Sequence, residues 1–436
     1  MNMIKKLVII MIFTFLGSVL IYVQAQDTIT LSLNEAFDYA VKHNKTLVNA
    51  RYNIDKTKLK NWEITAAGLP QISSAVDYTN YMGAEISFQL NEAAPAATIP
   101  FNPTSNFKVN VSQLIFNGSY FVGLQLAKLS YDASQLNYQK NETDVREQVS
   151  RAYYLVLVAE RTLDILAANR SNAQNIFQKT WNLYKSGIIE KSEADKLSVM
   201  VATIENSQKA TERQLEMAYN LLRLNLGLEA DQPLKLSTGL DEVSEKKKFQ
   251  SAVIEPFEIK NNFDYKLILN QEQLLTKQVT FEKANYFPTI AGFYSHTEKI
   301  LKPRFDMTPK NIIGLNASIP IFSSGLRKSK VSQAKINLYM INNTRELMDQ
   351  QISLQERQAR FNLNNLLEQY ETQKRNVEIS KEVFESMKLK FDQGIISSLE
   401  LTSANSNYMS AEGAFTNVLF QLLDAELTLR KIKGKL

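Results

Sequence analysis

Apolar residues recur at alternating intervals of four and three along two long stretches of the chain. In the first stretch these positions are Val145, Val149, Ala152, Val156, Ala159, Leu163 and Leu166. In the second they include Ala359, Leu363, Leu366, Tyr370, Val377, Phe384, Met387 and Phe391. This spacing is typical of helices that wind around partner helices. Proline is absent from 119–185 and from 326–392, so we predict one long helix over each range, about 100 Å if continuous.

A second pattern has the period of a β-strand. Over 312–322, Ile, Leu and Ala at every second position alternate with Gly, Asn, Ser and Pro, which predicts a strand with one apolar face. A weaker alternation predicts a strand over about 107–116, and partial alternation predicts two more over about 71–81 and 289–298. Each of these earlier strands follows a proline, Pro70 or Pro288, which ends the helix that precedes it.

The two patterns belong to an internal repeat. Gly118 and Gly325 lie 207 residues apart, and so do Gly187 and Gly394. Upstream the offset is 218, as between Pro70 and Pro288, so the first copy carries 11 extra residues between Pro70 and Gly118. We predict two copies of one helix–strand–strand–long helix–helix unit, over 26–227 and 262–436, joined by a connecting segment over 228–261. The first helices are expected over 33–67 and 264–286, and the returning helices over about 191–226 and 397–433.

Residues 1–25 have the pattern of an export signal. Lys5 and Lys6 precede an uncharged apolar run over 7–23, and Val23-Gln24-Ala25 offers a cleavage site. The alternative, a membrane anchor, is weaker because the run is only marginally long enough to span a bilayer. Lys and Arg number 50 against 45 Asp and Glu, a net charge of +5 that falls to +3 without this segment. This near balance argues against a nucleic-acid partner.

Composition excludes several functional classes. The 436 residues include only 14 Gly and 10 Pro, too few for a loop-rich all-β protein, and no Cys, so there are no disulfides, thiolate metal sites or Cys nucleophiles. The two His, His43 and His296, lie far apart in the sequence. We therefore expect no catalytic residues, no metal and no cofactor.

The predicted strands cannot form a complete membrane structure within one chain. No later stretch reaches 18 consecutive apolar residues, so the chain would span a membrane only through its strands, whose length of about 10 residues suits a tilted crossing. Four strands are fewer than the eight of the smallest membrane barrels. We therefore expect further copies of the chain to complete the sheet, and three copies would supply twelve strands.

The repeated segments resemble the outer membrane efflux protein family, the TolC family of trimeric channel-tunnels. The resemblance covers nearly the whole mature chain. It is carried by the strand starts at Pro70 and Pro288 and by the junctions Gln113-Leu114-Ile115-Phe116-Asn117-Gly118 and Ile319-Pro320-Ile321-Phe322-Ser323-Ser324-Gly325. The turns Tyr184-x-x-Gly187 and Phe391-x-x-Gly394 complete the set.

This resemblance implies a mainly α fold with a small β part. A homotrimer would form a 12-stranded β-barrel in the lipid of the cell outer membrane, continuous with an α-helical barrel in the periplasm. The family's members are passive exit ducts, not enzymes, of tripartite efflux pumps or type I secretion systems. They receive substrates from an inner-membrane transporter and a periplasmic adaptor. The loops over 82–106 and 299–311 would face outside.

The resemblance also implies functional residues at the periplasmic entrance. Glu400 stands at the position of the family's first constricting acidic ring, and Ser403 replaces the acid of a second ring in the family's type member. Ser192 and Glu193 stand where that member has a hydroxyl and an acid that tie helices shut, and Ile396 replaces a latching Arg. Three carboxylates in a ring would raise each other's pKa and attract cations. Alternatively, Glu400 and Glu193 are ordinary acids in the first turn of a helix, where they suit the helix dipole. The turns at Gly187 and Gly394, with Tyr184 and Phe391, would contact the adaptor.

Other interpretations remain open at this point. A periplasmic coiled-coil adaptor or a structural coiled coil of an envelope-spanning complex would also have an export signal and heptads. Neither accounts for strand pairs inserted twice at matching places. The aromatic residues Tyr78, Tyr81, Phe293 and Tyr294 are candidates for a membrane-interface girdle or for the inner face of the sheet. Lys246-Lys247-Lys248 is expected in a solvated loop.

Overall fold

The computed structural model of the chain describes residues 28–89, 97–244, 246–302 and 308–436. The predicted export signal over 1–25 lies outside these ranges. The chain forms two compact units, each assembled from three separate segments. Among the described residues, the first comprises 28–44, 148–244 and 376–416, and the second comprises 45–89, 97–147, 246–302, 308–375 and 417–436.

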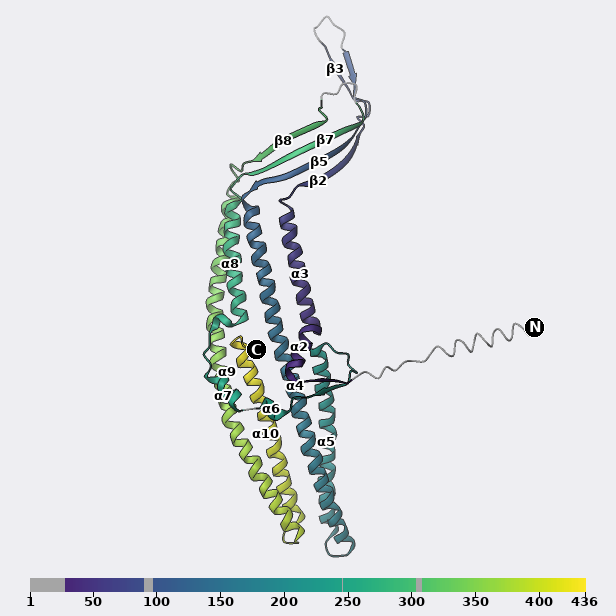
Figure 1. Cartoon of the computed structure of the whole chain (residues 1–436), viewed down its shortest axis with the longest axis vertical. Coiled ribbons are helices and arrows are strands. Elements are labelled where there is room, and N and C mark those ends of the chain that lie inside the picture. Colours follow the sequence, from purple (N-terminus) through teal and green to yellow (C-terminus); the bar gives the residue numbers. More distant parts are fainter. Residues whose placement is uncertain (1–27, 90–96, 245, 303–307) are drawn as a thin grey trace, which may run out of the picture. The chain divides into compact units, whose positions relative to one another are not determined.

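The second unit contains an antiparallel sheet with the strand order β2-β5-β7-β8 (Figure 1). The strands are β2 (Gln71–Thr79), β5 (Thr104–Asn117), β7 (Thr289–Leu301) and β8 (Asn311–Ser318). Both edges of this sheet, β2 and β8, have no further strand partner among the residues that the structure describes. The two copies of the repeat therefore meet at the centre, where β5 pairs with β7.

Two sequence expectations about this region were wrong. The strand expected over 312–322 ends at Ser318, because Pro320 has no N–H to donate to a sheet. The loop expected over 82–106 holds two short strands, β3 (Glu85–Phe88) and β4 (Ala97–Pro100), which pair with each other, and the beginning of β5.

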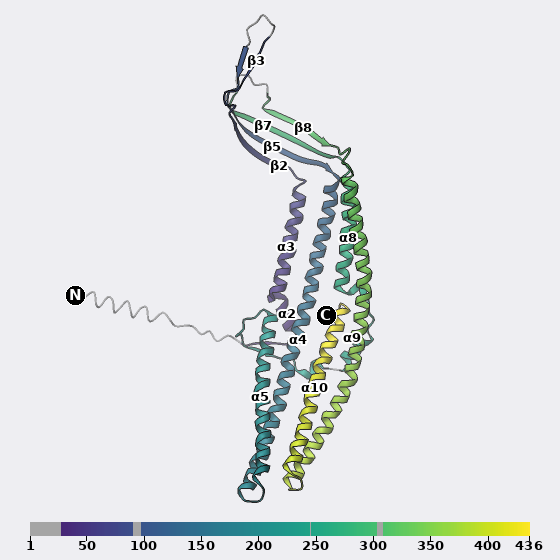
Figure 2. The same ribbon diagram turned by 180° about the vertical axis from the view of Figure 1, so that it is seen from behind.

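Four helical segments of the second unit run away from the sheet side by side (Figure 2). They are α3 (Lys45–Ala66), α8 (Phe263–Ala284) and the sheet-proximal parts of α4 (Gly118–Lys185) and α9 (Leu326–Asp392). The unit also contains α7 (Lys246–Ile254), the 3-10 turn η1 (Ile259–Asn261) and the end of α10 (Ser398–Ile432). Lys246-Lys247-Lys248 thus begin a helix, which corrects the loop expected there.

The first unit contains the other ends of α4, α9 and α10 together with α5 (Lys191–Leu226). A two-stranded parallel sheet of β1 (Ile29–Leu31) and β6 (Leu234–Leu236), α2 (Leu33–His43) and α6 (Leu240–Val243) complete it. The helix expected over 33–67 is interrupted at Asn44, whose backbone is extended (φ −61°, ψ 125°). No helix in the described ranges has the length and apolarity that a membrane crossing requires.

Most heptad positions of α4 and three of those of α9, Leu363, Leu366 and Phe384, are buried in the helical regions. In α4 all the predicted positions except Leu163 are buried. In the first unit one cluster joins all four helices: Leu166, Ala173, Ile176, Leu197, Met200, Ile204, Phe384, Leu401 and Ala404. The turns between the helices are thereby held by apolar packing.

Candidate functional site

The register of the four-stranded sheet separates apolar from polar side chains. Val111 of β5 pairs with Ile72 of β2 and with Tyr294 of β7, and Tyr294 pairs with Ile313 of β8. Paired residues share a face, because side chains alternate between faces along each strand. The apolar face carries Ile72, Val76, Tyr78, Phe107, Val109, Val111, Tyr294, Ile313 and Leu315, together with the polar residues Ser74, Gln113, His296 and Glu298. The polar face carries Ser73, Asp77, Asn106, Lys108, Asn110, Ser112, Ser295 and Asn316, together with the apolar residues Leu114, Phe293 and Ile312.

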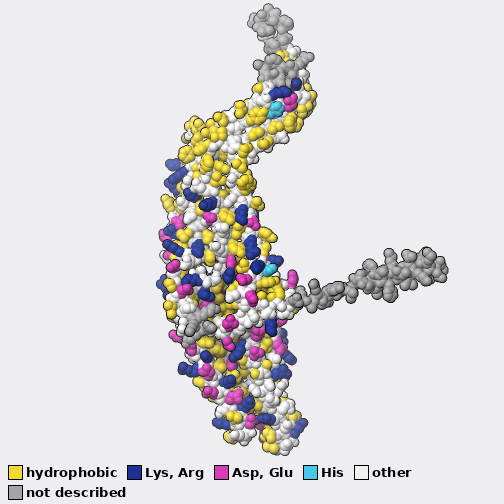
Figure 3. Space-filling model, viewed as in Figure 1, with side chains coloured by type: hydrophobic (Ala, Val, Ile, Leu, Met, Phe, Trp, Pro, Cys, Tyr) yellow, Lys and Arg dark blue, Asp and Glu magenta, His cyan; other side chains and the backbone are white. Residues whose placement is uncertain are grey.

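The two faces are suited to different surroundings. On the apolar face Ile313 is 84% exposed and Leu315 is 73% exposed, and Figure 3 shows hydrophobic side chains gathered over the sheet. On the polar face the Asn106 amide donates to Asp77 at 2.8 Å, and the Ser295 hydroxyl donates to Asn110 at 2.8 Å. An exposed apolar surface of this kind marks contact with a membrane or a partner. The polar face has the hydrogen-bonding groups of a surface that meets water.

The four candidate girdle aromatics do not share one environment. Tyr78 and Tyr294 lie on the apolar face. Phe293 lies on the polar face, where its ring covers Gly314 so closely that a Cβ there would sit 2.7 Å from it. Tyr81 lies outside the sheet, with its ring 5.2 Å from that of Phe101. The position of Tyr78 and Tyr294 on the apolar face is therefore compatible with a membrane-interface girdle. Phe293 instead fits the alternative expectation, in which the aromatic ring fills the opposite face of the sheet.

The strand–helix junctions of the two repeats have glycines at equivalent positions, but each glycine is favoured for a different reason. Pro70 and Pro288 each directly precede the first residue of a strand. At Gly118 a Cβ would lie 3.0 Å from the carbonyl oxygen of Ala284, so close packing against α8 favours glycine. Gly325 has open space around it but a φ of +83°, so its backbone conformation favours glycine instead.

The turns at Gly187 and Gly394 have the same geometry. Both glycines adopt a left-handed backbone, with φ of +70° and +73°. The Gly187 N–H donates to the carbonyl of Tyr184 at 2.8 Å, and the Gly394 N–H donates to that of Phe391 at 2.9 Å. These bonds, with one more from the following isoleucine in each turn, satisfy the carbonyl groups that a helix end leaves unpaired.

Two acids follow these turns at equivalent positions, because Glu193 and Glu400 lie 207 residues apart. Glu400 accepts a hydrogen bond from the backbone N–H of Ser397 at 3.0 Å, and the Ser397 hydroxyl accepts from the N–H of Glu400 at 3.4 Å. Glu400 therefore caps its own helix, α10. Glu193 instead accepts from the N–H of Ser398 at 3.1 Å and from the Ser398 hydroxyl. Its carboxylate thus joins the start of α5 to the start of α10.

The environment of Glu193 favours its charged form. Lys196 lies 2.8 Å from the carboxylate, and its hydrogen bond is the largest cause that holds the pKa of Glu193 below its usual value, followed by that of the Ser398 hydroxyl. The helix that would otherwise use this acid for capping, α5, has Glu190 at its N-cap with no side-chain capping bond. The identity of the N-cap residue thus explains why the two equivalent acids have different partners.

The remaining residues that the sequence suggested for an entrance are at the surface or in the core. Ser192 and Ser403 are exposed, and the Ser192 hydroxyl donates to Glu190 at 3.2 Å. Ile396 packs against the apolar cluster of the first unit, as does Phe391. Tyr184 lies beside Trp181, with ring centroids 5.4 Å apart.

Two asparagines that the repeat aligned, Asn44 and Asn262, hold helix ends together. The Asn44 amide donates to the carbonyl of Asn225 in α5 at 2.7 Å, and the Asn262 amide donates to that of Ile432 in α10 at 3.0 Å. The Asn262 side-chain oxygen also accepts from the N–H groups of Asp264 and Tyr265 in the first turn of α8. The offset of 218 residues between these asparagines was visible in the sequence, but their role depends on contacts that the sequence does not reveal.

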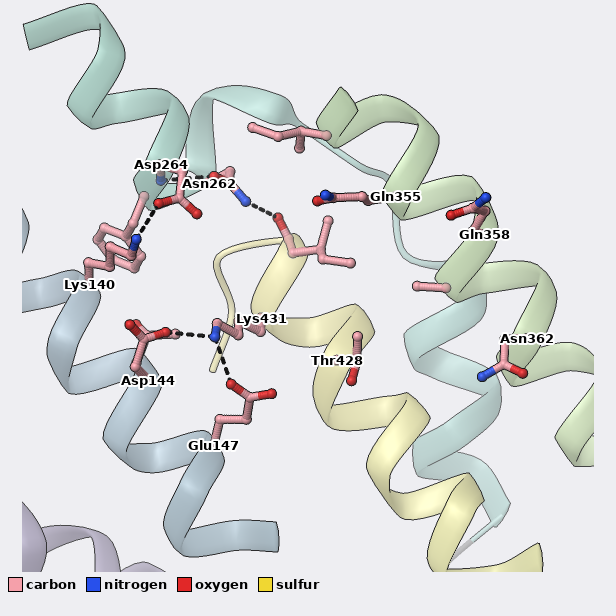
Figure 4. A pocket seen from close by; sticks show the side chains of 15 residues that line it. Lys140, Asp144, Glu147, Asn262, Asp264, Gln355, Gln358, Asn362, Thr428 and Lys431 are labelled. Carbon is pink, nitrogen blue, oxygen red and sulfur yellow. Dashed lines mark hydrogen bonds and ion pairs between the residues drawn. The ribbon is translucent and has the colours of Figure 1, made fainter. Parts of the chain in front are cut away.

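Charged residues surround the second of these junctions (Figure 4). The Lys431 ammonium lies 2.6 Å from Asp144 and 2.7 Å from Glu147, and Lys140 lies 2.6 Å from Asp264. Burial alone would lower the pKa of Lys431, but its hydrogen bonds to Asp144 and Glu147 raise it above the usual value. These ion pairs border a cavity of about 540 Å³ between α4, α8, α9 and α10. They join three of its four walls in the second unit.

The described ranges contain no group of three or more His, Asp or Glu side chains suited to a metal ion.

Comparisons with known proteins agree with this geometry. The family model described as "Outer membrane efflux protein" matches residues 38–228 and 260–435. The chain is 20% identical over 445 residues to outer membrane protein TolC of Salmonella enteritidis, covering 99% of this chain and 87% of that one. It superposes on the Campylobacter jejuni CmeC outer membrane channel with a TM-score of 0.73 at 15% identity, covering 92% of this chain and 85% of that one. For the open state of the Neisseria gonorrhoeae MtrE outer membrane channel the TM-score is 0.71 at 18% identity, with 92% and 88% covered.

Proposed function

Because the chain belongs to the outer membrane efflux protein family, we propose that three copies of it form the passive exit duct of a tripartite efflux pump. The protein is an outer-membrane efflux channel with its helical part in the periplasm, and such channels are transport ducts without enzymatic activity. In this proposal the two repeats, 26–227 and 262–436, each supply two strands and one pair of helical columns to the wall.

The observation that carries the proposal is that the four-stranded sheet has an apolar face, a polar face and two unpaired edge strands. The apolar face suits lipid and the polar face suits a water-filled lumen. The unpaired N–H and C=O groups of β2 and β8 cannot remain unsatisfied within a bilayer. Strands of neighbouring copies satisfy them if β8 of one copy pairs with β2 of the next.

Unpartnered heptad stripes on the helices support the same assembly. Met340, Leu347, Leu354 and Phe361 recur every seven residues along α9 and are all exposed. On α3, Tyr52 and Leu59 are likewise seven residues apart and exposed. In the chain, α3 leads into the edge strand β2 and α9 follows the edge strand β8. When β8 of one copy pairs with β2 of the next, α9 of the first copy therefore packs against α3 of the second.

Disulfide trapping of the edges tests this assembly, and the natural chain has no Cys to interfere. A variant with Ser73→Cys in β2 and Asn316→Cys in β8, with adjacent polar-face positions tried in the same way, is expected to yield covalent trimers upon mild oxidation in membranes. As a matched control, Asn110→Cys with Ser295→Cys joins two residues paired within one chain and is expected to yield only monomers on a reducing-agent-free gel. If every edge pair remains monomeric, the proposed closure is wrong.

At the entrance we propose that the turns at Gly187 and Gly394 contact a periplasmic adaptor, with Tyr184 and Phe391 holding the helix ends. The inner-membrane transporter supplies the substrates and sets the direction. Glu193 ties α5 to α10 within each copy, while Glu400, and to a lesser degree Ser403, border the constriction. This division is supported by the hydrogen bonds of Glu193 to Ser398, which Glu400 does not share.

Planar-bilayer recording tests the constriction. Glu400→Ala is expected to lower the preference for cations, because three carboxylates in a ring attract them. Ser403→Ala changes no charge and serves as the control. An unchanged conductance and cation preference in the Glu400→Ala channel would remove Glu400 from the constriction.

A further inference from the structure

The first twenty residues of α9 carry only positive charge. Residues 326–345 contain five Lys or Arg and no Asp or Glu, and the first acid is Glu346. Figure 3 shows Lys and Arg side chains at the sheet-proximal ends of the helices, directly beside the hydrophobic sheet. Cations near the beginning of a helix are opposed by the helix dipole. A concentration of them at this place therefore indicates a compensating anion.

Only some of these cations have partners within the chain. The Arg345 guanidinium lies 2.9 Å from Glu272, and Arg327 lies over the ring of Tyr286. Lys328, Lys330 and Lys335 are exposed, and none of them forms an ion pair with any residue that the structure describes.

The internal repeat shows which side of α9 these lysines occupy. At the offset of 207, Lys328 is equivalent to Phe121 and Lys335 to Lys128. The Phe121 ring lies 6.1 Å from that of Phe116, which pairs with Ile290 on the apolar face of the sheet. Lys328 and Lys335, seven residues apart and so on one side of the helix, therefore continue the apolar face.

The third lysine lies on the other side. Lys330 is equivalent to Gly123, which lines a cavity together with Leu114. Leu114 pairs with Ala291 on the polar face of the sheet. Lys330 thus continues the polar face, and the chain itself provides a matched control for the other two lysines.

We propose that Lys328 and Lys335 bind the phosphate groups of phospholipids in the membrane leaflet that borders the helices. Between the apolar face and these lysines, Ile321 and Phe322 are nearly fully exposed, so apolar surface is followed by positive charge in the order of acyl chains and headgroups. Lys328 and Lys335 are about 10 Å apart along the helix. A headgroup layer is about 5–8 Å deep, and the flexible lysine stems extend far enough for both ammonium groups to reach it.

The proposal goes beyond the channel function and rests on it only for the position of the sheet in the membrane. Lysine contributes to binding an anionic lipid surface by about fivefold per residue. Neutral zwitterionic lipid offers a phosphate whose charge is balanced, so we expect the lysines to produce a preference for anionic over zwitterionic phospholipid.

The experiment uses the intact, detergent-extracted channel and native mass spectrometry. The natural protein, Lys328→Gln with Lys335→Gln, and Lys330→Gln are each titrated with phosphatidylglycerol and with phosphatidylcholine of matched acyl chains. The double variant is expected to lose the preference for phosphatidylglycerol by about 25-fold, which is about fivefold for each lysine. Lys330→Gln is expected to retain it, and all three proteins are expected to have the same oligomeric mass.

Two results would overturn the proposal. The first is an unchanged preference for phosphatidylglycerol in the double variant; if that variant also loses binding of purified lipopolysaccharide, the lysines belong to the other leaflet. The second is an equal loss of preference in Lys330→Gln. A channel that still assembles and conducts in any of these cases would leave the proposed function standing.

Discussion

At the scale of single residues, the N-cap decides what a neighbouring acid does. Ser397 engages Glu400 in a reciprocal capping arrangement. The equivalent N-cap of α5 is Glu190, which offers no such hydroxyl, and Glu193 extends to Ser398 instead. The sequence placed both acids in the first turn of a helix. It could not show that one of them crosses to another helix, because that depends on how α5 and α10 pack.

Removing the Glu193 carboxylate is expected to loosen the start of α10. A hydrogen bond to a charged group contributes about 1.5 kcal/mol, so in Glu193→Gln the amide of Ser398 should exchange its hydrogen roughly tenfold faster. Hydrogen-exchange mass spectrometry of peptides that begin in this turn measures the change. Glu400→Gln serves as the reciprocal control, since it affects the amide of Ser397 and should leave that of Ser398 protected.

The same contact predicts a pH dependence. The pKa of Glu193 in the folded protein is lowered from its usual 4.5, so its stabilising contribution is complete above pH 4.5 and is lost as the pH falls through the lowered value. Exchange of the Ser398 amide should therefore accelerate, relative to the intrinsic rate, only in strongly acidic solution. A natural protein and a Glu193→Gln variant with the same relative acceleration would contradict this assignment.

At the scale of elements, the sequence predicted the long helices well and the short elements poorly. The helix expected over 326–392 has those bounds, and the one expected over 119–185 begins one residue earlier. Long heptad stretches without proline leave few alternatives. The hairpin of β3 and β4, the interruption at Asn44 and the helix at Lys246 depend on local pairing or capping over a few residues. Such short signals are not distinguishable from those of loops.

The sequence repeat identified the positions of the junctions between elements but not the contacts that those residues make. Asn44 and Asn262 were aligned by the repeat at its offset of 218, and Gly227 and Gly434 at its offset of 207. A Cβ on Gly227 would lie 2.5 Å from the carbonyl oxygen of His43, and Gly434 is packed in the same way against Asn261. Close approach of two backbones explains these glycines, and it becomes visible only in three dimensions.

The packing of the helix ends in the first unit can be tested with two neighbouring leucines. Leu401 is fully buried in the apolar cluster, whereas Leu399 is 61% exposed. Leu401→Ala is expected to destabilise this unit by about 2–5 kcal/mol, because it removes buried methyl groups and leaves a cavity. Leu399→Ala is expected to change the stability by less than about 0.5 kcal/mol. Denaturant titration of the extracted protein, followed by helical circular dichroism, compares the two, and equal effects would contradict the described packing.

At the scale of the whole molecule, the isolated chain leaves much apolar surface without a partner. Most of the apolar face of the sheet, the stripe on α9 and the stripe on α3 are exposed in a single copy. Surface of this extent is characteristic of an incomplete assembly. The same surfaces explain why the sequence alone indicates self-association, because its heptads and strands are present in numbers that one chain cannot satisfy.

Charged residues in the α9 stripe are expected to prevent assembly without unfolding the chain. In a variant with Leu347→Glu and Leu354→Glu, the mass of the detergent-extracted protein should fall from three chains to one, because burying unpaired carboxylates between helices is strongly unfavourable. Helical circular dichroism should be retained.

The control for this experiment places the same glutamates at exposed polar positions. Asn337→Glu with Thr344→Glu has the same seven-residue spacing on the neighbouring side of α9 and should retain the larger mass. A stripe variant that also remained trimeric would exclude this part of α9 from the contact between copies.

The equivalence of Glu193 and Glu400 has a consequence for how the duplicated halves diverge. Both repeats have a glutamate at the same position of the returning helix. With Ser397 as the N-cap it caps its own helix, and with Glu190 there instead it binds the start of another helix. Exchanging the N-cap residue, by Glu190→Ser in one repeat or Ser397→Glu in the other, tests whether the two glutamates exchange these two hydrogen-bonding patterns. Each repeat is therefore a natural reference for the other, and every structural difference between them can be compared within one chain.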